Sequence, residues 1–295
     1  MPPVASSVVP VFLIAALGFL AQRTLRPDVG GYIRLVLYFF VPFLVFDQVA
    51  GVGGSPVALG GFVAAFALTY LALYLVARGL AALLRLGEGA ARVLIASAVF
   101  PNSGNMGLSV ALFALGEEGL ERAVVYFLLA TVVLFGYGPA LFRGVGGVSG
   151  ALMTLRLPFV WGLLLGMVFA WRGWSLPGVL ASPVELLGRA AIPMLLFGLG
   201  MQISGTPFRL GWFELLASAV RLLLGPAAAW AAGTALGLGR ADLVVLVLIS
   251  GMPVAVNTYM LAAEFGGEGE LAARVVAVST ALSFLSIPLV LSLVT

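Results

Sequence analysis

The sequence predicts an all-α polytopic membrane protein whose ten transmembrane helices form two inverted repeats of five. The 295 residues are 62% hydrophobic and only 9% charged, whereas soluble proteins carry roughly a quarter charged residues. Apolar runs recur along the whole chain, most of them near the ~20 residues that a helix needs to cross a bilayer. The two halves of the chain also share proline, polar and charged positions, which predicts the repeat.

The expected membrane segments follow one another with short connections. In the first repeat, residues 1–143, they cover 4–22, 31–49, 57–84, 91–115 and 121–142. In the second repeat, residues 155–295, they cover 155–171, 181–203, 208–236, 241–265 and 271–294. A flexible linker at 144–154 joins the repeats. No basic residue precedes the first segment, so we expect a helix that is kept and not a cleaved signal peptide.

Arginines set the expected orientation. All 15 basic residues are arginines, and the chain has no histidine or cysteine. If the N-terminus lies outside, ten arginines fall at cytoplasmic ends, and only Arg122, Arg172, Arg189 and Arg240 fall on the opposite side. Cytoplasmic loops carry the excess of positive charge. We therefore expect a multi-pass protein of the cytoplasmic membrane with both termini outside.

Matched positions define the repeat. Pro10 and Gly18 recur as Pro158 and Gly166. Pro101, Asn105, Ala111, Phe113, Glu118 and Arg122 recur 152 residues later as Pro253, Asn257, Ala263, Phe265, Glu270 and Arg274. Because five crossings end on the opposite side of the membrane, such repeats must be inverted, as they are in many secondary transporters.

Segments four and nine contain the polar breaks VFPNSGNMGL (99–108) and ISGMPVAVNTYMLA (249–262). Pro101 and Pro253 interrupt their helices, and the freed backbone groups need protein or a cavity around them. Two crossing half-helices aim their positive N-termini at one point, which suits a carboxylate. One polar kink is more often structural, but a matched pair favours a substrate site. The expected binding residues are Asn102, Ser103, Gly104, Asn105, Val254, Ala255, Val256, Asn257 and Thr258.

These breaks and several other stretches resemble the auxin efflux carrier family of membrane transporters. PNSGNMGLSVALFALG resembles that family's fourth-helix motif, and GMPVAVNTYMLAAEFG resembles its ninth-helix counterpart. RLPFVWGLLLGMVFAWRGWSLP and AAIPMLLFGLGMQIS are similar to its sixth and seventh helices, and RLLLGPAAAW to its eighth. The resemblance covers essentially the whole chain.

The resemblance implies a fold related to bile-acid symporters and sodium/proton antiporters. Helices 1, 2, 6 and 7 would form a scaffold and a homodimer, and helices 3–5 and 8–10 would move past them in an elevator-like motion. Family substrates are small organic anions, auxin in plants and dicarboxylates such as malate or malonate in bacteria. By motif match, Pro101 and Pro253 are the crossover hinges and Asn102 contacts substrate. Segment three begins without the Asp and Lys of plant carriers, so we expect a prokaryotic member that carries a metabolite anion.

Further candidates lie outside the two breaks. Arg221, midway along segment eight, is either a counter-ion for the substrate, an anchor for broken-helix carbonyls or a structurally paired arginine. Tyr137 in segment five either faces the site or packs in the helix bundle. Asp47, at the end of segment two, is either a protonatable gate or a solvated helix end. Gln48 and Gln202 are expected at the membrane interface.

The composition disfavours an enzyme. Without histidine or cysteine, a Ser-His dyad, thiol catalysis and an HExxH zinc site are excluded. We predict no cofactor, no metal and no nucleic-acid partner. Neither break contains Asp or Glu, which disfavours cation exchange as the main activity. Two alternatives stay open: a sodium-coupled organic-anion symporter of the bile-acid type, with proton or sodium coupling undetermined, and a membrane sensor built on a transporter fold.

Overall fold

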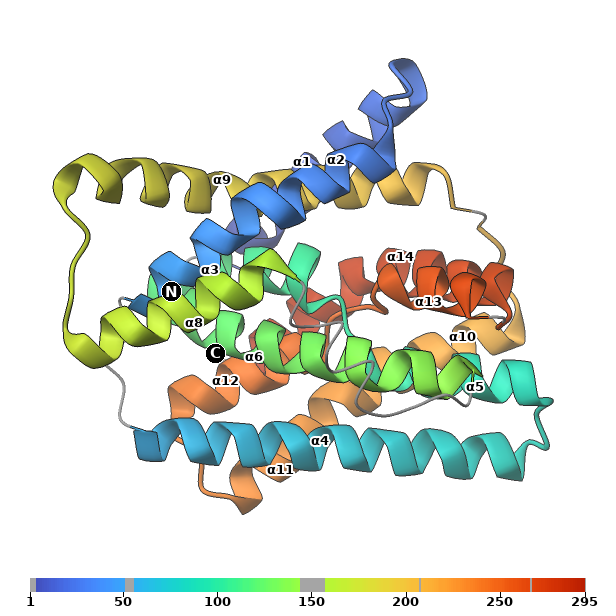
Figure 1. Cartoon of the computed structure of the whole chain (residues 1–295). Coiled ribbons are helices and arrows are strands. Elements are labelled where there is room, and N and C mark those ends of the chain that lie inside the picture. The colour runs from blue at the N-terminus through green and yellow to red at the C-terminus, as the bar shows by residue number, and fades with distance from the viewer. Residues whose placement is uncertain (1–3, 51–55, 144–156, 207, 266, 295) are drawn as a thin grey trace.

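The computed structural model describes residues 4–50, 56–143, 157–206, 208–265 and 267–294, and these residues are almost entirely helical (Figure 1). The linker expected at 144–154 lies outside them. The main α-helices are α1 (Val4–Thr24), α4 (Pro56–Leu83), α5 (Glu88–Val99), α6 (Leu108–Arg143, two helices joined across a kink), α8 (Pro158–Arg172), α9 (Gly178–Ser204), α12 (Arg240–Ser250), α13 (Asn257–Glu264) and α14 (Gly269–Val294). Within the described residues no β-strand forms, and the only β-type pairing is an isolated bridge between Pro101 and Val254.

Three helices contain a π-helical turn. The first runs through α2 (Val29–Leu35), η1 (Val36–Phe40) and α3 (Val41–Ala50), and the second through α10 (Trp212–Ala219), η3 (Val220–Leu224) and α11 (Gly225–Ala235). Pro42 and Pro226 follow these two turns. A proline ring clashes with the carbonyl four residues earlier, and the wider π turn relieves that clash while the helix continues. The third turn, η2 (Ser103–Gly107), leads into α6.

By length and composition, six of the described helices could cross a membrane, and α8 and Val8–Thr24 are shorter apolar helices. An all-helical membrane architecture is therefore confirmed, while the arrangement in ten inverted crossings stays a prediction. Within α6, Gly116 has φ 72° and ψ −163°, so this long helix changes direction there. The expected boundary between segments 91–115 and 121–142 coincides with that kink.

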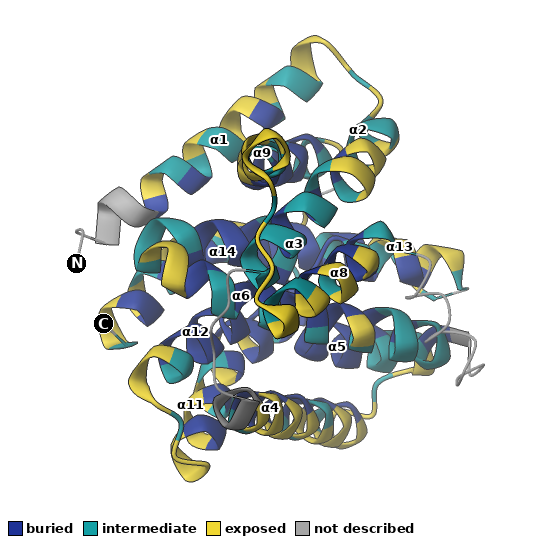
Figure 2. Ribbon diagram, turned by 60° about the vertical axis from the view of Figure 1, so that its left-hand side comes forward, coloured by how far each residue is buried: buried dark blue, intermediate teal, exposed yellow. Residues whose placement is uncertain are grey.

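The helices pack as two groups. In the first, α1 lies along α9, and α3 contacts both α8 and α9. Close approach depends on glycine: a Cβ at Gly18 would meet the carbonyl of Phe197, and a Cβ at Gly162 would meet the carbonyl of Pro42. In the second group, α4 lies beside α5 and α11, and α10 and α13 pack against α14. Figure 2 shows that buried residues concentrate between the two groups and inside the second.

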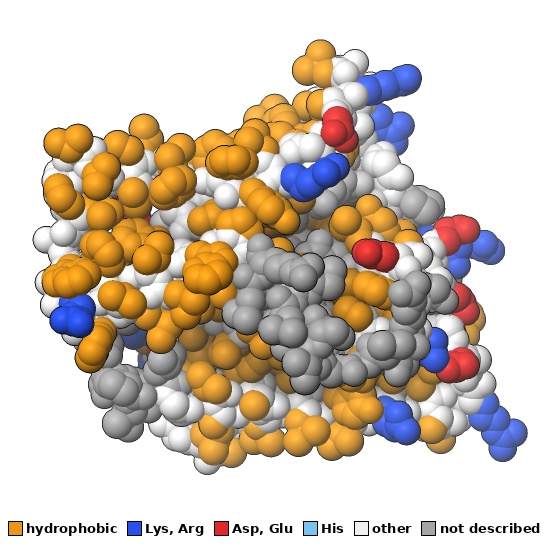
Figure 3. Space-filling view, viewed as in Figure 1, with side chains coloured by type: hydrophobic (Ala, Val, Ile, Leu, Met, Phe, Trp, Pro, Cys, Tyr) orange, Lys and Arg blue, Asp and Glu red, His pale blue; other side chains and the backbone are white. Residues whose placement is uncertain are grey.

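The outer helix faces are apolar, as expected for surfaces in contact with lipid. Trp171 and Leu285, for example, are 80% and 76% exposed. Charged side chains visible in Figure 3 gather mainly at the right-hand end of the molecule, and both termini lie toward the other end in Figure 1. Helix ends are tied by ion pairs at 2.6 Å between Arg122 and Asp242 and at 2.8 Å between Arg274 and Glu214.

Candidate functional site

Two interrupted helices cross at the centre of the structure. Each interrupted helix consists of a half before its break, called here the first-half helix, and a half after it, called the second-half helix. The first-half helices are α5 and α12, which end at Val99 and Ser250, just ahead of Pro101 and Pro253. The extended residues that follow lie antiparallel. The backbone N–H of Asn102 donates to the carbonyl of Pro253 at 2.7 Å, and that of Ala255 donates to Phe100 at 2.9 Å. Proline explains both interruptions, because it lacks the amide hydrogen that a continuous helix would use.

A second-half helix starts directly after each extended segment. Asn102 is the N-cap of η2, and its Oδ1 accepts a hydrogen bond from the backbone N–H of Asn105 at 3.2 Å. On the other side α13 begins at Asn257 without a side-chain cap. Each helix N-terminus carries roughly half a positive charge. The crossing therefore brings two positive helix ends to one place without a charged side chain.

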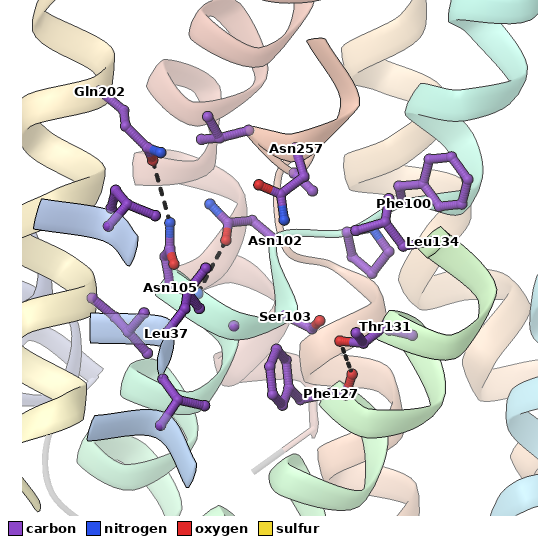
Figure 4. A pocket seen from close by; sticks show the side chains of 18 residues that line it. Leu37, Phe100, Asn102, Ser103, Asn105, Phe127, Thr131, Leu134, Gln202 and Asn257 are labelled. Carbon is purple, nitrogen blue, oxygen red and sulfur yellow. Dashed lines mark hydrogen bonds between the residues drawn. The ribbon is translucent and has the colours of Figure 1, made fainter. Parts of the chain in front are cut away.

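A pocket of about 60 Å³ opens at this crossing (Figure 4). Its polar lining consists of Asn102, Ser103, Asn105, Thr131, Gln202 and Asn257. Its apolar lining comes from both helix groups, with Ile33, Leu37, Val41 and Leu195 on one side and Phe100, Phe127, Ala130 and Leu134 on the other. Among the residues that the structure describes, no charged side chain lines it. The chain has only three asparagines, and all three line this pocket.

The pocket holds an unused hydrogen-bond donor. The amide nitrogen Nδ2 of Asn102 is buried and has no partner, although Oδ1 of the same side chain caps η2. Across the opening, Nδ2 of Asn105 reaches Oε1 of Gln202 only at 3.5 Å. A buried donor left unpaired costs about 1–3 kcal/mol. Such a donor, aimed into a neutral cavity, is positioned to bind an acceptor group that enters the pocket.

Eleven crossover residues were predicted to bind the substrate or to act as hinges, and the structure gives the position of each. Eight of them line the pocket: Pro101, Asn102, Ser103, Gly104, Asn105, Ala255, Val256 and Asn257. Three do not. Pro253 and Val254 lie behind the crossing, where the backbone N–H of Val254 donates to Oγ of Ser279 at 3.1 Å. Thr258 is fully buried, and its hydroxyl has no partner. The backbone N–H of Val254 is thus already paired.

Arg221 lies outside the pocket. It is fully buried, and its guanidinium donates to the carbonyl oxygens of Ala98 and Ser250. These are the C-terminal ends of α5 and α12, on the side of the crossing away from the second-half helices. Direct contact with the substrate as a counter-ion does not fit this geometry. The second role considered for Arg221, an anchor for broken-helix carbonyls, does.

Tyr137 and Asp47 are also absent from the pocket lining. Tyr137 packs edge-to-face on Tyr74, with ring centroids 6.0 Å apart and an interplanar angle of 84°, so it serves packing here. Asp47 is half-buried in α3. In this structure neither residue reaches the space where a ligand would bind.

Sequence reasoning missed Gln202 and Thr131. Gln202 was expected at the interface, but it lines the pocket from α9, opposite Asn105. Thr131 lines it from α6 and donates its hydroxyl to the carbonyl of Phe127 at 2.7 Å. The only sign of Gln202 in the sequence was a single amide residue in an apolar segment, two and four positions after Gly200 and Gly198. Which way it faces depends on helix packing alone.

Comparisons with known proteins match this chain to membrane transporters. The family described as membrane transport protein matches residues 3–153 and 149–291. An "Uncharacterized transporter" of Methanothermobacter thermautotrophicus is 31% identical over 200 residues, which is 66% of either chain. A "Putative malonate transporter" of Rhizobium meliloti is 24% identical over 301 residues, covering 96% of this chain and 93% of that one. A "Probable auxin efflux carrier component 1b" of Oryza sativa is 29% identical over 119 residues, 38% of this chain and 21% of the rice protein.

Proposed function

Since this chain belongs to the membrane transport protein family, which includes auxin efflux carriers, we propose that it is a secondary transporter of a small organic anion. The observation that carries the proposal is the neutral pocket at the helix crossing with its unpaired Asn102 amide. Two helix N-termini of about half a positive charge each, together with amide donors, favour a carboxylate. A dicarboxylate such as malonate fits the name of the Rhizobium relative.

The proposed architecture is the inverted repeat with an elevator motion. Close helix contacts support it, because they recur in the two halves. A Cβ at Gly18 would meet the carbonyl of Phe197, and a Cβ at Gly166 would meet that of Phe46. Gly166 is the repeat equivalent of Gly18. Phe46 and Phe197 are also matched, since Pro42 and Phe46 recur 151 residues later as Pro193 and Phe197. Such backbone contacts favour a rigid scaffold made of α1, α2–α3, α8 and α9, which would also carry the homodimer contact.

The pocket lies where an elevator needs it. One wall belongs to the proposed scaffold, through Leu37, Val41 and Gln202, and the other belongs to the crossing and to α6. In transporters built this way, one bundle moves against the other around a site at the repeat interface. The ligand would then travel with Asn102 and Asn257, while Gln202 would stay with the scaffold. We place the protein in the cytoplasmic membrane with both termini outside.

Uptake of labelled malonate into proteoliposomes tests the proposal, with Asn102→Ala as the diagnostic variant. We expect wild-type uptake to saturate, and Asn102→Ala to lower the affinity about 10- to 100-fold, because a hydrogen bond to a charged group contributes about 1.5–3 kcal/mol. Ser292→Ala, on an exposed position of α14, is the control and should transport normally. Uptake by Asn102→Ala equal to that of wild type would show that the helix crossing does not bind the substrate.

The two remaining functions give different results in the same assay. Uptake that requires a sodium gradient would identify a sodium-coupled symporter, and uptake driven by a pH gradient would identify proton coupling. Binding of malonate in a thermal-shift assay without any uptake would favour a sensor, since a ligand that binds only the folded state raises its stability.

A further inference from the structure

We propose that Arg221 is a positioning residue for the anion site: a fixed internal cation that balances the negative ends of the two first-half helices and holds the crossing in register. Its effect on anion affinity rests on the proposed function, whereas its effect on the helix ends does not. The role comes from where its guanidinium is bound.

The guanidinium joins both halves of the repeat. One of its nitrogens donates to the carbonyl of Ala98 and another to the carbonyl of Ser250. Ala98 is the second-to-last residue of α5, and Ser250 is the last of α12. The last four carbonyls of any helix lack partners within the helix. Arg221 therefore satisfies backbone groups that the two proline breaks leave open.

Charge balance explains why this residue is an arginine. Six ion pairs between arginines and acidic side chains are found among the described residues, and none includes Arg221. The C-terminus of a helix carries about half a negative charge, so two such ends sum to about one. That sum matches the single positive charge of the guanidinium. The fork of a guanidinium also reaches two carbonyls at once, which a lysine ammonium does less well.

The local sequence is built for this contact. Arg221 lies in the π turn η3, one turn ahead of Gly225. A Cβ at Gly225 would overlap both the carbonyl oxygen of Ser250 and the guanidinium of Arg221. Glycine therefore leaves the space in which α11 meets the end of α12. Beside it, the hydroxyls of Tyr126 and Ser250 form a neutral hydrogen bond at 3.0 Å.

The contacts of Arg221 also fix the position of the pocket, because the residues that they anchor lie only a few positions from those that line it. Ala98 is followed by Phe100, Pro101 and Asn102, and Ser250 by the Pro253–Ala255 segment that pairs with them. If the negative ends of α5 and α12 repelled each other, this pairing would shift and Asn102 and Asn257 would move apart. In other transporters with broken helices, such C-terminal ends can coordinate a coupling cation. In this protein the guanidinium of Arg221 binds the C-terminal ends of α5 and α12 instead.

The test uses purified full-length protein in nanodiscs, with malonate as the probe. Arg221→Ala should bind malonate at least tenfold more weakly than wild type, and its thermal midpoint should fall by on the order of 10 °C. Low-millimolar guanidinium chloride should restore part of both losses, whereas sodium chloride at equal ionic strength should not. Arg221→Lys, which keeps the charge but not the guanidinium fork, should lose clearly less affinity than Arg221→Ala. Tyr126→Phe is the matched control, since it removes a buried neutral bond at the same place, and its affinity should be unchanged.

Three results would overturn the proposal: wild-type affinity in Arg221→Ala, equal rescue by guanidinium and sodium, or a folded Arg221→Lys as impaired as Arg221→Ala. If Arg221→Ala does not fold, Arg221→Lys decides: near wild-type affinity supports a charge role, and lost affinity with an intact fold refutes it. If wild type binds no malonate, the proposed substrate class fails. The guanidinium-specific rise in the thermal midpoint of Arg221→Ala still tests the helix-end role.

Discussion

Asn102 acts at the crossing through both ends of its side chain. Its oxygen caps η2 by accepting from Asn105, and its nitrogen stays unpaired in the pocket. In the proposed site the residue would therefore couple the start of a helix to ligand binding, because its short amide side chain offers an acceptor and a donor at once. Asp would keep the cap but would replace the donor with a negative charge.

Gln202 supplies the second residue-scale prediction. Gln202→Leu removes the polar group that faces Asn105 from α9, so malonate affinity should fall about 2- to 10-fold, the value of a neutral hydrogen bond. Isothermal titration of the purified variant measures this. Gln48→Leu, the same exchange outside the pocket, should bind like wild type. Equal affinity in both variants would show that Gln202 contributes nothing to binding.

At the scale of elements, proline chemistry governs where helices stop and where they continue. Pro101 and Pro253 end α5 and α12, whereas Pro42 and Pro226 are absorbed by the π turns η1 and η3. The sequence predicted the first two breaks because polar residues follow them. It did not predict the π turns, since the choice between a break and a wider turn depends on what packs around the helix.

The contact of α1 with α9 gives a prediction about stability. At Gly200 a Cβ would overlap the carbonyl of Ala15, so Gly200→Val should push the two helices apart and cost about 1–3 kcal/mol or more. A clear drop in the thermal midpoint of the purified protein is expected. Gly79→Val is the matched control, because Gly79 on α4 is exposed and has open space around it. A midpoint for Gly200→Val equal to that of Gly79→Val would contradict the rigid scaffold.

At the scale of the whole molecule, charge at the helix ends determines orientation in the membrane. The chain contains no cysteine, so one introduced cysteine reports one position. Gly87, between α4 and α5, and Ser175, between α8 and α9, are both exposed. The connection from α4 to α5 and the connection from α8 to α9 lie at opposite ends of the molecule (Figure 1). With both termini outside, a membrane-impermeant maleimide should label Ser175→Cys in intact cells and Gly87→Cys only after permeabilisation. The reverse pattern would invert the topology.

Hydropathy and proline are local properties, and the sequence by itself therefore determined that this is a helical membrane protein with two polar helix breaks at Pro101 and Pro253. Side-chain direction is not local. Only the tertiary structure decided that Gln202 faces the pocket, that Tyr137 does not, and that Arg221 binds the ends of two helices from different halves of the chain. Each of these depends on how helices that are far apart in the sequence are rotated and packed against one another. Packing of this kind has no signal in a single apolar run.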